Sequence, residues 1–172
     1  NVIIGLYEGS KSIPVAREKG FEVVSTAEAV RRADVIFVAL PDTKQPAAYE
    51  KDIAPNLSRG KTLLFSHGFS ITYKEHTGVI PPSDIDVILC APKGSGTSVR
   101  RNFLAGAGIN SSYSVFQDAT GRAEERAIAL GIAIGSGYLF PTTFEKEVFS
   151  DLTGERGVLM GALAGIMDAQ YQ

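Results

Sequence analysis

The sequence predicts an α/β fold in which a mostly parallel sheet carries helices on both faces. Along most of the 172 residues, short apolar runs of strand length alternate with segments of helical spacing. Such alternation is typical of right-handed, parallel α/β architecture. One run, residues 35–40, is apolar at every position, as expected for a strand that is buried on both faces.

The first elements follow from apolar runs and helix-capping residues. Residues 2–6 and 21–24 are predicted strands. Between them, we expect a helix to begin near Ser12 and to end at Gly20. Ser25 followed by Glu28 forms a capping box that opens a second helix over residues 27–33. The chain therefore opens with two strand–helix units.

The middle of the chain continues the alternation. Strands are predicted over residues 35–40, 62–65 and 87–90, and a helix over residues 46–52. Residues 97–109 are expected to hold a short helix and a loop, and residues 114–116 a strand. A helix over residues 121–134 and a strand over residues 138–140 complete the sheet. Alternation stops near Pro141, where we expect a domain boundary.

A long helix, capped by Thr142 or Thr143, follows this boundary. On it, Glu147, Asp151 and Glu155 are spaced by four residues, so their carboxylates would share one face. Like charges at this spacing destabilise a helix. A cation such as Mg²⁺, which prefers carboxylate oxygens, would offset that cost. The same spacing is also typical of a solvated acidic face.

Composition excludes several classes of function. The formal net charge of −2 gives no basic surface for nucleic acid. The single cysteine, Cys90, lies in an apolar run, which excludes an internal disulfide framework and a cysteine-based zinc site. The longest apolar stretch, residues 157–167, is too short to span a bilayer. We expect neither a nucleic acid nor a membrane as partner.

Polar residues follow four of the predicted strands, at the edge where open α/β sheets bind ligands. They are Ser10 and Ser12 after residues 2–6, Asp42 and Gln45 after residues 35–40, His67 after residues 62–65, and Lys93 after residues 87–90. Hydroxyls and backbone amides before a helix can hold a phosphate. Beside a helix rich in carboxylates, this set suggests a nucleotide cofactor and a metal-bound substrate. Each position taken singly also suits an ordinary turn.

The sequence resembles the ketol-acid reductoisomerases (acetohydroxyacid isomeroreductases), and the resemblance covers essentially the whole chain. The matching segments are residues 5–12 (GLYEGSKS), 40–42 (LPD) with Gln45, 65–69 (FSHGF), 81–82 (PP), 86–88 (DVI), 91–96 (APKGSG), 99–100 (VR), 118–121 (DATG), 142–144 (TTF) and 150–155 (SDLTGE). Their length and order make chance a poor explanation.

The resemblance implies a Rossmann-like NAD(P)-binding domain over residues 1–141 and the beginning of a helical, knotted C-terminal domain over residues 142–172. It implies Mg²⁺-dependent alkyl migration in 2-acetolactate or 2-aceto-2-hydroxybutyrate. Reduction by NADPH then gives the 2,3-dihydroxy acid, in valine, isoleucine and leucine biosynthesis. Such an enzyme would be a homo-oligomer, cytoplasmic in a bacterium and mitochondrial or plastid in a eukaryote.

The resemblance also implies roles for the residues that carry chemistry. Asp151 would bridge two Mg²⁺ ions, and Glu155 would bind one of them. Glu147 would lie beside the metals and help to move protons, with Lys93 near it. His67 would lie near the nicotinamide and the substrate.

For the cofactor, the resemblance places Asp42 and Gln45 at the adenosine end, and Ser10 and Ser12 at the 2′-phosphate of NADPH. Lys11 beside these serines supports the same choice. Two departures point toward NADH. Tyr7 stands where many NADPH-using members carry Arg, and Glu8 could bind a ribose hydroxyl instead.

The chain also lacks features that the family has. No Gly-x-Gly-x-x-Gly turn follows a predicted strand, and the family's two further metal-binding glutamates are not among these 172 residues. The resemblance also implies that the first strand, with its glycine turn, and most of the C-terminal helical domain are missing. Loss of the first strand would expose strand edges, so we expect the chain by itself to be inactive. Two other functions stay open. One is a nicotinamide-dependent hydroxyacid dehydrogenase without an isomerase step, and the other is a non-catalytic nucleotide-binding module.

Overall fold

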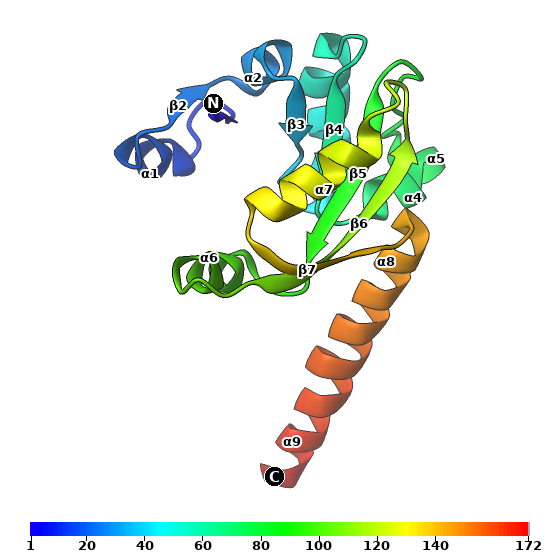
Figure 1. The fold of residues 1–172 in the computed structure, drawn as a ribbon. Coiled ribbons are helices and arrows are strands. Elements are labelled where there is room, and N and C mark those ends of the chain that lie inside the picture. The colour runs from blue at the N-terminus through cyan, green and yellow to red at the C-terminus, as the bar shows by residue number, and fades with distance from the viewer. Residues whose placement is uncertain (172) are drawn as a thin grey trace.

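The computed structural model describes residues 1–171, apart from the side chain of residue 156. A small parallel sheet pairs β1 (Ile3–Gly5) with β2 (Glu22–Val24). A larger sheet has the spatial order β3 (Val35–Phe37), β4 (Thr62–Phe65), β5 (Asp86–Pro92), β6 (Ile109–Gln117) and β7 (Ser136–Pro141). The β5–β6 pair is antiparallel and the other pairs are parallel. The predicted Rossmann-like, mostly parallel α/β fold is confirmed (Figure 1).

Two helices accompany the small sheet. Helix α1 (Ser12–Glu18) begins at Ser12, as predicted, and its N-cap is Lys11. Helix α2 (Thr26–Arg32) begins after Ser25, whose hydroxyl accepts a hydrogen bond from the amide of Glu28 at 3.2 Å. The cap that the sequence predicts for α2 is therefore confirmed.

The segment after β3 is a succession of short helical turns rather than one helix. It comprises η1 (Asp42–Lys44), α3 (Gln45–Ala48), the π-helical turn η2 (Tyr49–Ile53) and η3 (Ala54–Asn56). Two short helices, α4 (Phe69–Thr72) and α5 (Lys74–Thr77), follow β4 where the sequence showed only a polar segment. Helices α6 (Gly96–Leu104) and α7 (Ala123–Ala133) agree in position with the predicted ones.

The C-terminal helical segment begins after Thr143, whose hydroxyl accepts from the amide of Lys146 at 3.1 Å. It comprises α8 (Phe144–Asp151), the π-helical η4 (Leu152–Leu163) and α9 (Ala164–Tyr171). The segment leaves the sheet and points away from the body of the molecule (Figure 1). Within residues 1–171, no helix combines the length and hydropathy that crossing a bilayer requires.

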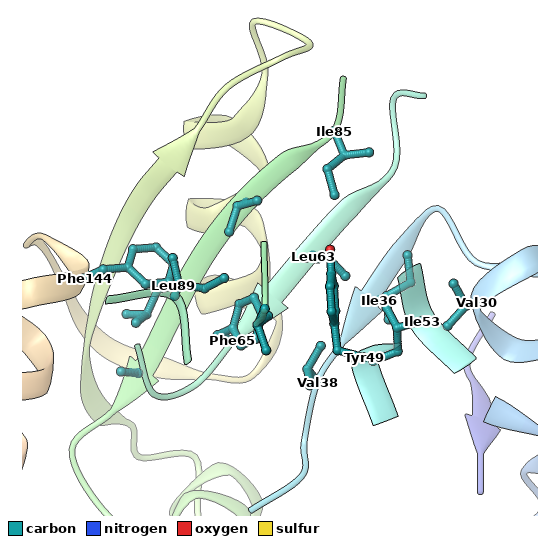
Figure 2. Close-up of a cluster of buried hydrophobic side chains, with 14 residues drawn as sticks. Val30, Ile36, Val38, Tyr49, Ile53, Leu63, Phe65, Ile85, Leu89 and Phe144 are labelled. Carbon is teal, nitrogen blue, oxygen red and sulfur yellow. The ribbon is translucent and has the colours of Figure 1, made fainter. Parts of the chain in front are cut away.

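The core occupies both faces of the larger sheet. On one face, side chains of β3, β4 and β5 pack against Tyr49 and Ile53 of η2, Ile71 of α4 and Phe144 of α8 (Figure 2). On the other face, Leu64, Ile88 and Cys90 pack against Ala123 and Ala127 of α7. Burial raises the pKa of the Cys90 thiol to about 11, so this cysteine is a packing residue and not a nucleophile.

Strand β3 differs from the sequence-based expectation of a strand buried on both faces. It is the edge strand of the larger sheet, and the side chain of Phe37 is 54% exposed. Among the described residues, β3 pairs only with β4, and β1 pairs only with β2. The two sheets are therefore not joined by hydrogen bonds, and the free edge of β3 exposes apolar side chains that the sequence alone placed inside.

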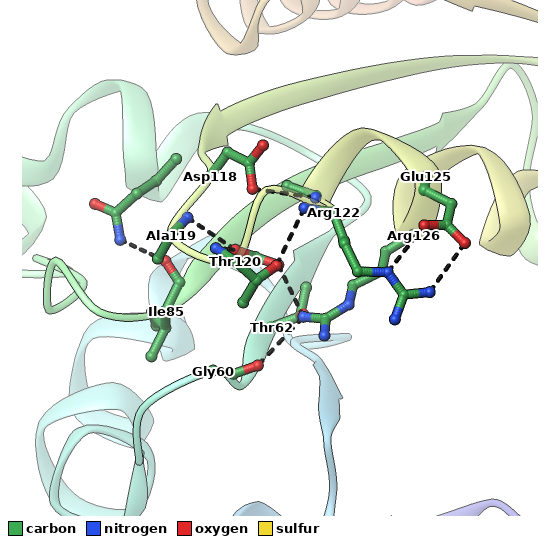
Figure 3. Close-up of polar contacts among 12 residues, drawn as sticks. Gly60, Thr62, Ile85, Asp118, Ala119, Thr120, Arg122, Glu125 and Arg126 are labelled. Carbon is green, nitrogen blue, oxygen red and sulfur yellow. Dashed lines mark hydrogen bonds and ion pairs between the residues drawn. The ribbon is translucent and has the colours of Figure 1, made fainter.

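A buried ionic network fixes the amino end of β5. Asp86 is fully buried and accepts hydrogen bonds from the amides of Ala119 and Thr120, the hydroxyl of Thr120 and the guanidinium of Arg126, at 2.7–3.0 Å. Arg126 of α7 also donates to the hydroxyl of Thr62 on β4 (Figure 3). The network ties α7 to the two central strands at the end opposite the strand termini that carry His67 and Lys93.

Candidate active site

Four elements meet at the carboxyl end of the central strands. His67 follows β4, Lys93 follows β5, and Glu147 and Asp151 lie on α8. Strand β6 is antiparallel to β5, so its beginning lies at the same edge, with Ser112 paired opposite Ala91. The close packing of α8 on α4 and β6 brings the carboxylates of α8 to this edge. Sequence-predicted residues from three separate segments thus converge.

Glu147 is the most buried carboxylate of this group, with 3% of its surface exposed. The ammonium of Lys93 donates to Oε1 of Glu147. The hydroxyl of Ser112 donates to Oε2 at 2.6 Å. A buried carboxylate is tolerated when it is paired and hydrogen-bonded. Here each oxygen has a partner, one charged and one neutral.

His67 lies between two carboxylates. Its Nε2 is 3.1 Å from Oδ2 of Asp151, and its Nδ1 is 3.4 Å from Oδ2 of Asp42. Both ring nitrogens are buried, yet neither makes a hydrogen bond of good geometry among the described residues. The ring stacks on Phe69 with an interplanar angle of 12°. Buried polar atoms without hydrogen-bond partners are uncommon, and a ligand or a water molecule can supply the missing hydrogen bonds.

Gly68 allows α8 to approach the loop that carries His67. A Cβ at this position would lie 3.0 Å from the carbonyl oxygen of Phe144 and 3.1 Å from Cγ2 of Val148. The ring of Phe144 is held in turn by edge-on contacts with Phe65 and Phe116. The absence of a side chain at Gly68 therefore sets the separation between the loop and α8, and with it the approach of His67 to Asp151.

Asp42 and Gln45 lie at the end of β3. Gln45 is buried, and its amide nitrogen donates to the carbonyl of Leu40 at 2.8 Å and to Oδ1 of Asp42 at 3.3 Å. The other oxygen of Asp42 faces His67. The structure thus places Asp42 beside the histidine, and its role at the adenosine end stays a prediction. The Oε1 atom of Gln45 is buried with no partner in the described part of the chain.

Ser10 and Ser12 belong to the turn between β1 and α1, in the small sheet. Ser10 is buried, and its hydroxyl accepts from the amide of Ser12 at 3.3 Å. Ser12, Lys11 and Glu8 are exposed. The two predicted phosphate-binding serines therefore differ, because the hydroxyl oxygen of Ser10 accepts from its own turn and that of Ser12 faces solvent.

The predicted metal ligands are only partly assembled. Asp151 ends α8 beside His67, and Glu155 lies in η4 with its side chain exposed. Carboxylate oxygens match the ligand preference of Mg²⁺. However, no group of three or more His, Cys, Asp or Glu side chains among the described residues is arranged to hold a metal ion. The donor type fits Mg²⁺, and the number of donors does not complete a site.

Sequence reasoning missed Ser112. The predicted strand covered residues 114–116, whereas β6 begins at Ile109, so Ser112 was placed outside the sheet. Three consecutive polar residues at 110–112 hid the strand pattern. Ser111, Ser112 and Ser114 are buried in β6, and this burial follows from the pairing of β6 with β5, which the local sequence does not show.

Comparison with known proteins places this arrangement in a family. Residues 1–138 match the family model described as the NADPH-binding domain of acetohydroxy acid isomeroreductase. A ketol-acid reductoisomerase (NAD(+)) from Desulfosudis oleivorans is 63% identical over 174 residues, which cover 99% of this chain and 49% of that protein. A probable mitochondrial ketol-acid reductoisomerase from Schizosaccharomyces pombe is 50% identical over 176 residues, covering 100% of this chain and 43% of that protein.

A solved structure gives the same result for the fold. The NADH-preferring ketol-acid reductoisomerase from an uncultured archean superposes with a TM-score of 0.92 at 41% identity, over 98% of this chain and 52% of that one. The chain thus spans about half the length of the curated relatives that it matches. Because the family model covers most of the chain and these relatives match nearly all of it, the chain belongs to the ketol-acid reductoisomerase family and contains its NAD(P)-binding domain.

Proposed function

We propose that the complete protein containing this chain is a ketol-acid reductoisomerase of branched-chain amino-acid biosynthesis. It would rearrange 2-acetolactate or 2-aceto-2-hydroxybutyrate by alkyl migration and reduce the product to the 2,3-dihydroxy acid. One observation carries the proposal. The Lys93–Glu147 pair and the His67–Asp151 pair both lie at the carboxyl edge of the sheet. His67, Lys93 and Asp151 belong to segments in which the chain resembles the family, and Glu147 lies between two such segments.

The residues of this chain would manage protons and position during the reaction. Glu147 can accept a proton, and Lys93 can pass one, because the two side chains are joined directly. The Lys93 side chain is 37% exposed, so it connects the buried carboxylate with the surface where substrate would lie. His67 presents two buried ring nitrogens whose hydrogen-bonding capacity is unused. It would bind and orient polar groups of the substrate or cofactor there.

Asp151 and Glu155 would hold the two Mg²⁺ ions together with groups that these residues do not supply. When bound, the ions supply the positive charge that polarises a ketone and stabilises the neighbouring alkoxide. An octahedral Mg²⁺ shell needs more ligands than two carboxylates, so substrate, water and other parts of the complete protein would contribute. In the chain alone, we propose weak Mg²⁺ affinity.

The test is Mg²⁺-dependent turnover of acetolactate by the complete protein and its Asp151→Asn variant. We expect the variant to lose about 100-fold or more in turnover, because the loss of a group that only supports a metal ligand already costs about 10–100-fold. The matched control is Asp168→Asn, an exposed acidic residue on α9, which should keep full activity. Undiminished, Mg²⁺-dependent turnover by Asp151→Asn would contradict the metal assignment.

The same assay separates the two alternatives. A hydroxyacid dehydrogenase would reduce a 2-keto acid without Mg²⁺ and would not consume acetolactate. A nucleotide-binding module would bind the cofactor and turn over neither compound. The proposal requires both the Mg²⁺-dependent isomerisation and the reduction.

For the cofactor, the sequence favours NADPH, and the exposed Ser12 and Lys11 remain as groups that can bind a 2′-phosphate. Two observations make NADH the second candidate. The hydroxyl oxygen of Ser10 accepts from the amide of Ser12, and the exposed carboxylate of Glu8 would repel a phosphate. In line with this, the Desulfosudis relative is named for NAD(+) and the archean one is described as NADH-preferring.

We further propose that residues 142–172 begin a helical domain and that the complete protein is a homo-oligomer. The domain boundary is supported by the end of β7 at Pro141 and by the departure of the following helices from the sheet (Figure 1). Oligomer formation is supported by the exposed apolar side chains of η4 and α9. They are Val158, Leu159, Met160, Leu163, Ile166, Met167 and Tyr171. A helix that exposes this many apolar side chains is typical of an interface.

A further inference from the structure

Ser112 is joined to the proposed proton-carrying carboxylate by a short hydrogen bond. Its hydroxyl lies 2.6 Å from Oε2 of Glu147, within the range of charge-assisted O–H···O⁻ bonds. Ser112 is fully buried and Glu147 is nearly so. Because water does not reach this bond, its loss would leave a carboxylate oxygen without a partner.

Three elements hold the Glu147 carboxylate from two sides. Lys93, after β5, contacts Oε1, and Ser112, on β6, contacts Oε2, while α8 carries Glu147 itself. The terminal torsion of a glutamate is broad, so a single contact leaves the carboxylate plane free to turn. Separate partners on the two oxygens fix that plane and keep Oε1 directed at Lys93.

We propose that Ser112 is a positioning residue for the reductoisomerase reaction. It acts through Glu147, because it holds the carboxylate in the orientation that pairs with Lys93. The inference rests on the proposed function, in which Glu147 and Lys93 move protons. Ser112 touches neither substrate nor cofactor in this role.

The neighbouring serines of β6 show that this contact is particular to Ser112. The Ser111 hydroxyl is hydrogen-bonded to the hydroxyl of Ser136 on β7 at 2.7 Å. Ser114 is buried like Ser112, yet its hydroxyl makes no hydrogen bond to Glu147 in the part of the chain that the structure describes. Ser114→Ala is therefore a matched control for Ser112→Ala, because both serines are buried on the same strand and the same atom is removed.

The experiment measures kcat and KM for acetolactate, together with cofactor affinity, in the complete protein. For Ser112→Ala we expect kcat to fall roughly tenfold, as for loss of a hydrogen bond to a charged group, with KM and cofactor affinity nearly unchanged. Ser114→Ala should keep the wild-type kcat. Ser112→Cys preserves the shape but has a weak donor, so it should lose kcat as Ser112→Ala does. A cysteine variant with wild-type kcat would show that packing, not the hydrogen bond, matters.

A double-mutant cycle with Glu147→Gln distinguishes a positioning role of Ser112 from a purely structural one, because it compares the loss of kcat in the single and double variants. If Ser112 acts through Glu147, Ser112→Ala should cause no further loss of kcat in the Glu147→Gln background. Independent, multiplicative losses would overturn the inference. So would equal kcat for Ser112→Ala and Ser114→Ala in an active enzyme. A wild-type protein without reductoisomerase activity would instead refute the proposed function itself.

Discussion

Glu8 is the residue at which cofactor preference is most directly testable. Its carboxylate is exposed in the turn before α1, close in sequence to Lys11 and Ser12. A 2′-phosphate bound to these residues would face a like charge, which raises the free energy of the NADPH complex relative to the NADH complex.

We therefore expect Glu8→Gln to raise the ratio of NADPH to NADH affinity several-fold, about threefold to tenfold, and most strongly at low salt. The measurement is fluorescence titration of both cofactors into the complete protein at two ionic strengths. Glu18→Gln, an exposed glutamate at the end of α1, is the control. An unchanged affinity ratio would show that Glu8 does not discriminate between the cofactors.

At the residue scale, the sequence singles out most of the side chains that meet at the carboxyl edge of the sheet. His67, Lys93, Glu147 and Asp151 are each singled out by the sequence, and the structure brings them together in the Lys93–Glu147 ion pair and the close contact of His67 with Asp151. Strand-end positions are predictable because a parallel sheet places its carboxyl ends at one edge. Ser112 was not predictable, because it reaches this edge only through the antiparallel direction of β6, which no local pattern encodes.

At the scale of elements, the docking of α8 on the loop after β4 depends on Gly68. Gly68→Ala would place a methyl group within 3.0 Å of backbone and ring atoms of Phe144, which are themselves well packed. We expect a loss of about 1–3 kcal/mol in the free energy of unfolding, as for overpacking, measured by urea denaturation.

The same substitution should lower kcat in the complete protein, because moving α8 separates Asp151 from His67. Gly96→Ala is the control, since a Cβ at that position would have no atom within 4 Å. If Gly68→Ala and Gly96→Ala unfold at the same urea concentration, the close approach of α8 does not constrain the fold.

The Asp86 network makes a second prediction at this scale. Asp86→Ala would leave the guanidinium of Arg126 and the donors of Thr120 without their acceptor. Breaking a buried pair by removing one partner costs about 3–5 kcal/mol, and we expect a loss of that order in the free energy of unfolding. As the control, Glu125→Ala breaks the exposed ion pair with Arg122 and should change the free energy of unfolding little. Similar losses in the two variants would contradict the prediction.

Element positions are predictable from local sequence, whereas pairing partners are not. Ser25 and Thr143 cap their helices as expected, because capping involves residues three apart. The apolar run at residues 35–40 correctly predicts a strand but wrongly predicts its burial on both faces. Whether a strand is central or at an edge depends on how many strands hydrogen-bond to it. In the described residues, β3 is hydrogen-bonded to β4 alone.

At the scale of the whole molecule, η4 and α9 carry apolar side chains that no other part of residues 1–171 covers. Leu163 and Met167 are four residues apart and therefore share a face, and both are largely exposed. If this face joins two copies of the protein, replacing both residues with Gln should lower the apparent mass of the complete protein by weakening its association.

Light scattering over a range of protein concentrations measures this change. Gln170→Ser, on the same helix, should leave the mass unchanged. A mass that stays the same in the Leu163→Gln, Met167→Gln double variant at every concentration would show that this face is not the subunit interface.

In the described residues, the small sheet shares no strand pairing with the larger one, which affects how stably the small sheet is held. The small sheet is linked to the rest mainly through α2, with Val30 in the core and Arg31 bonded to Asn56. Such a unit can open by local unfolding without disrupting β4 and β5. The turn that carries Ser10 and Ser12 would then be present only for the fraction of time in which the unit is closed. In this chain taken alone, apparent cofactor affinity would be reduced by that fraction, so the closing equilibrium of the small sheet, as much as the side chains of its turn, would set how tightly a nucleotide binds.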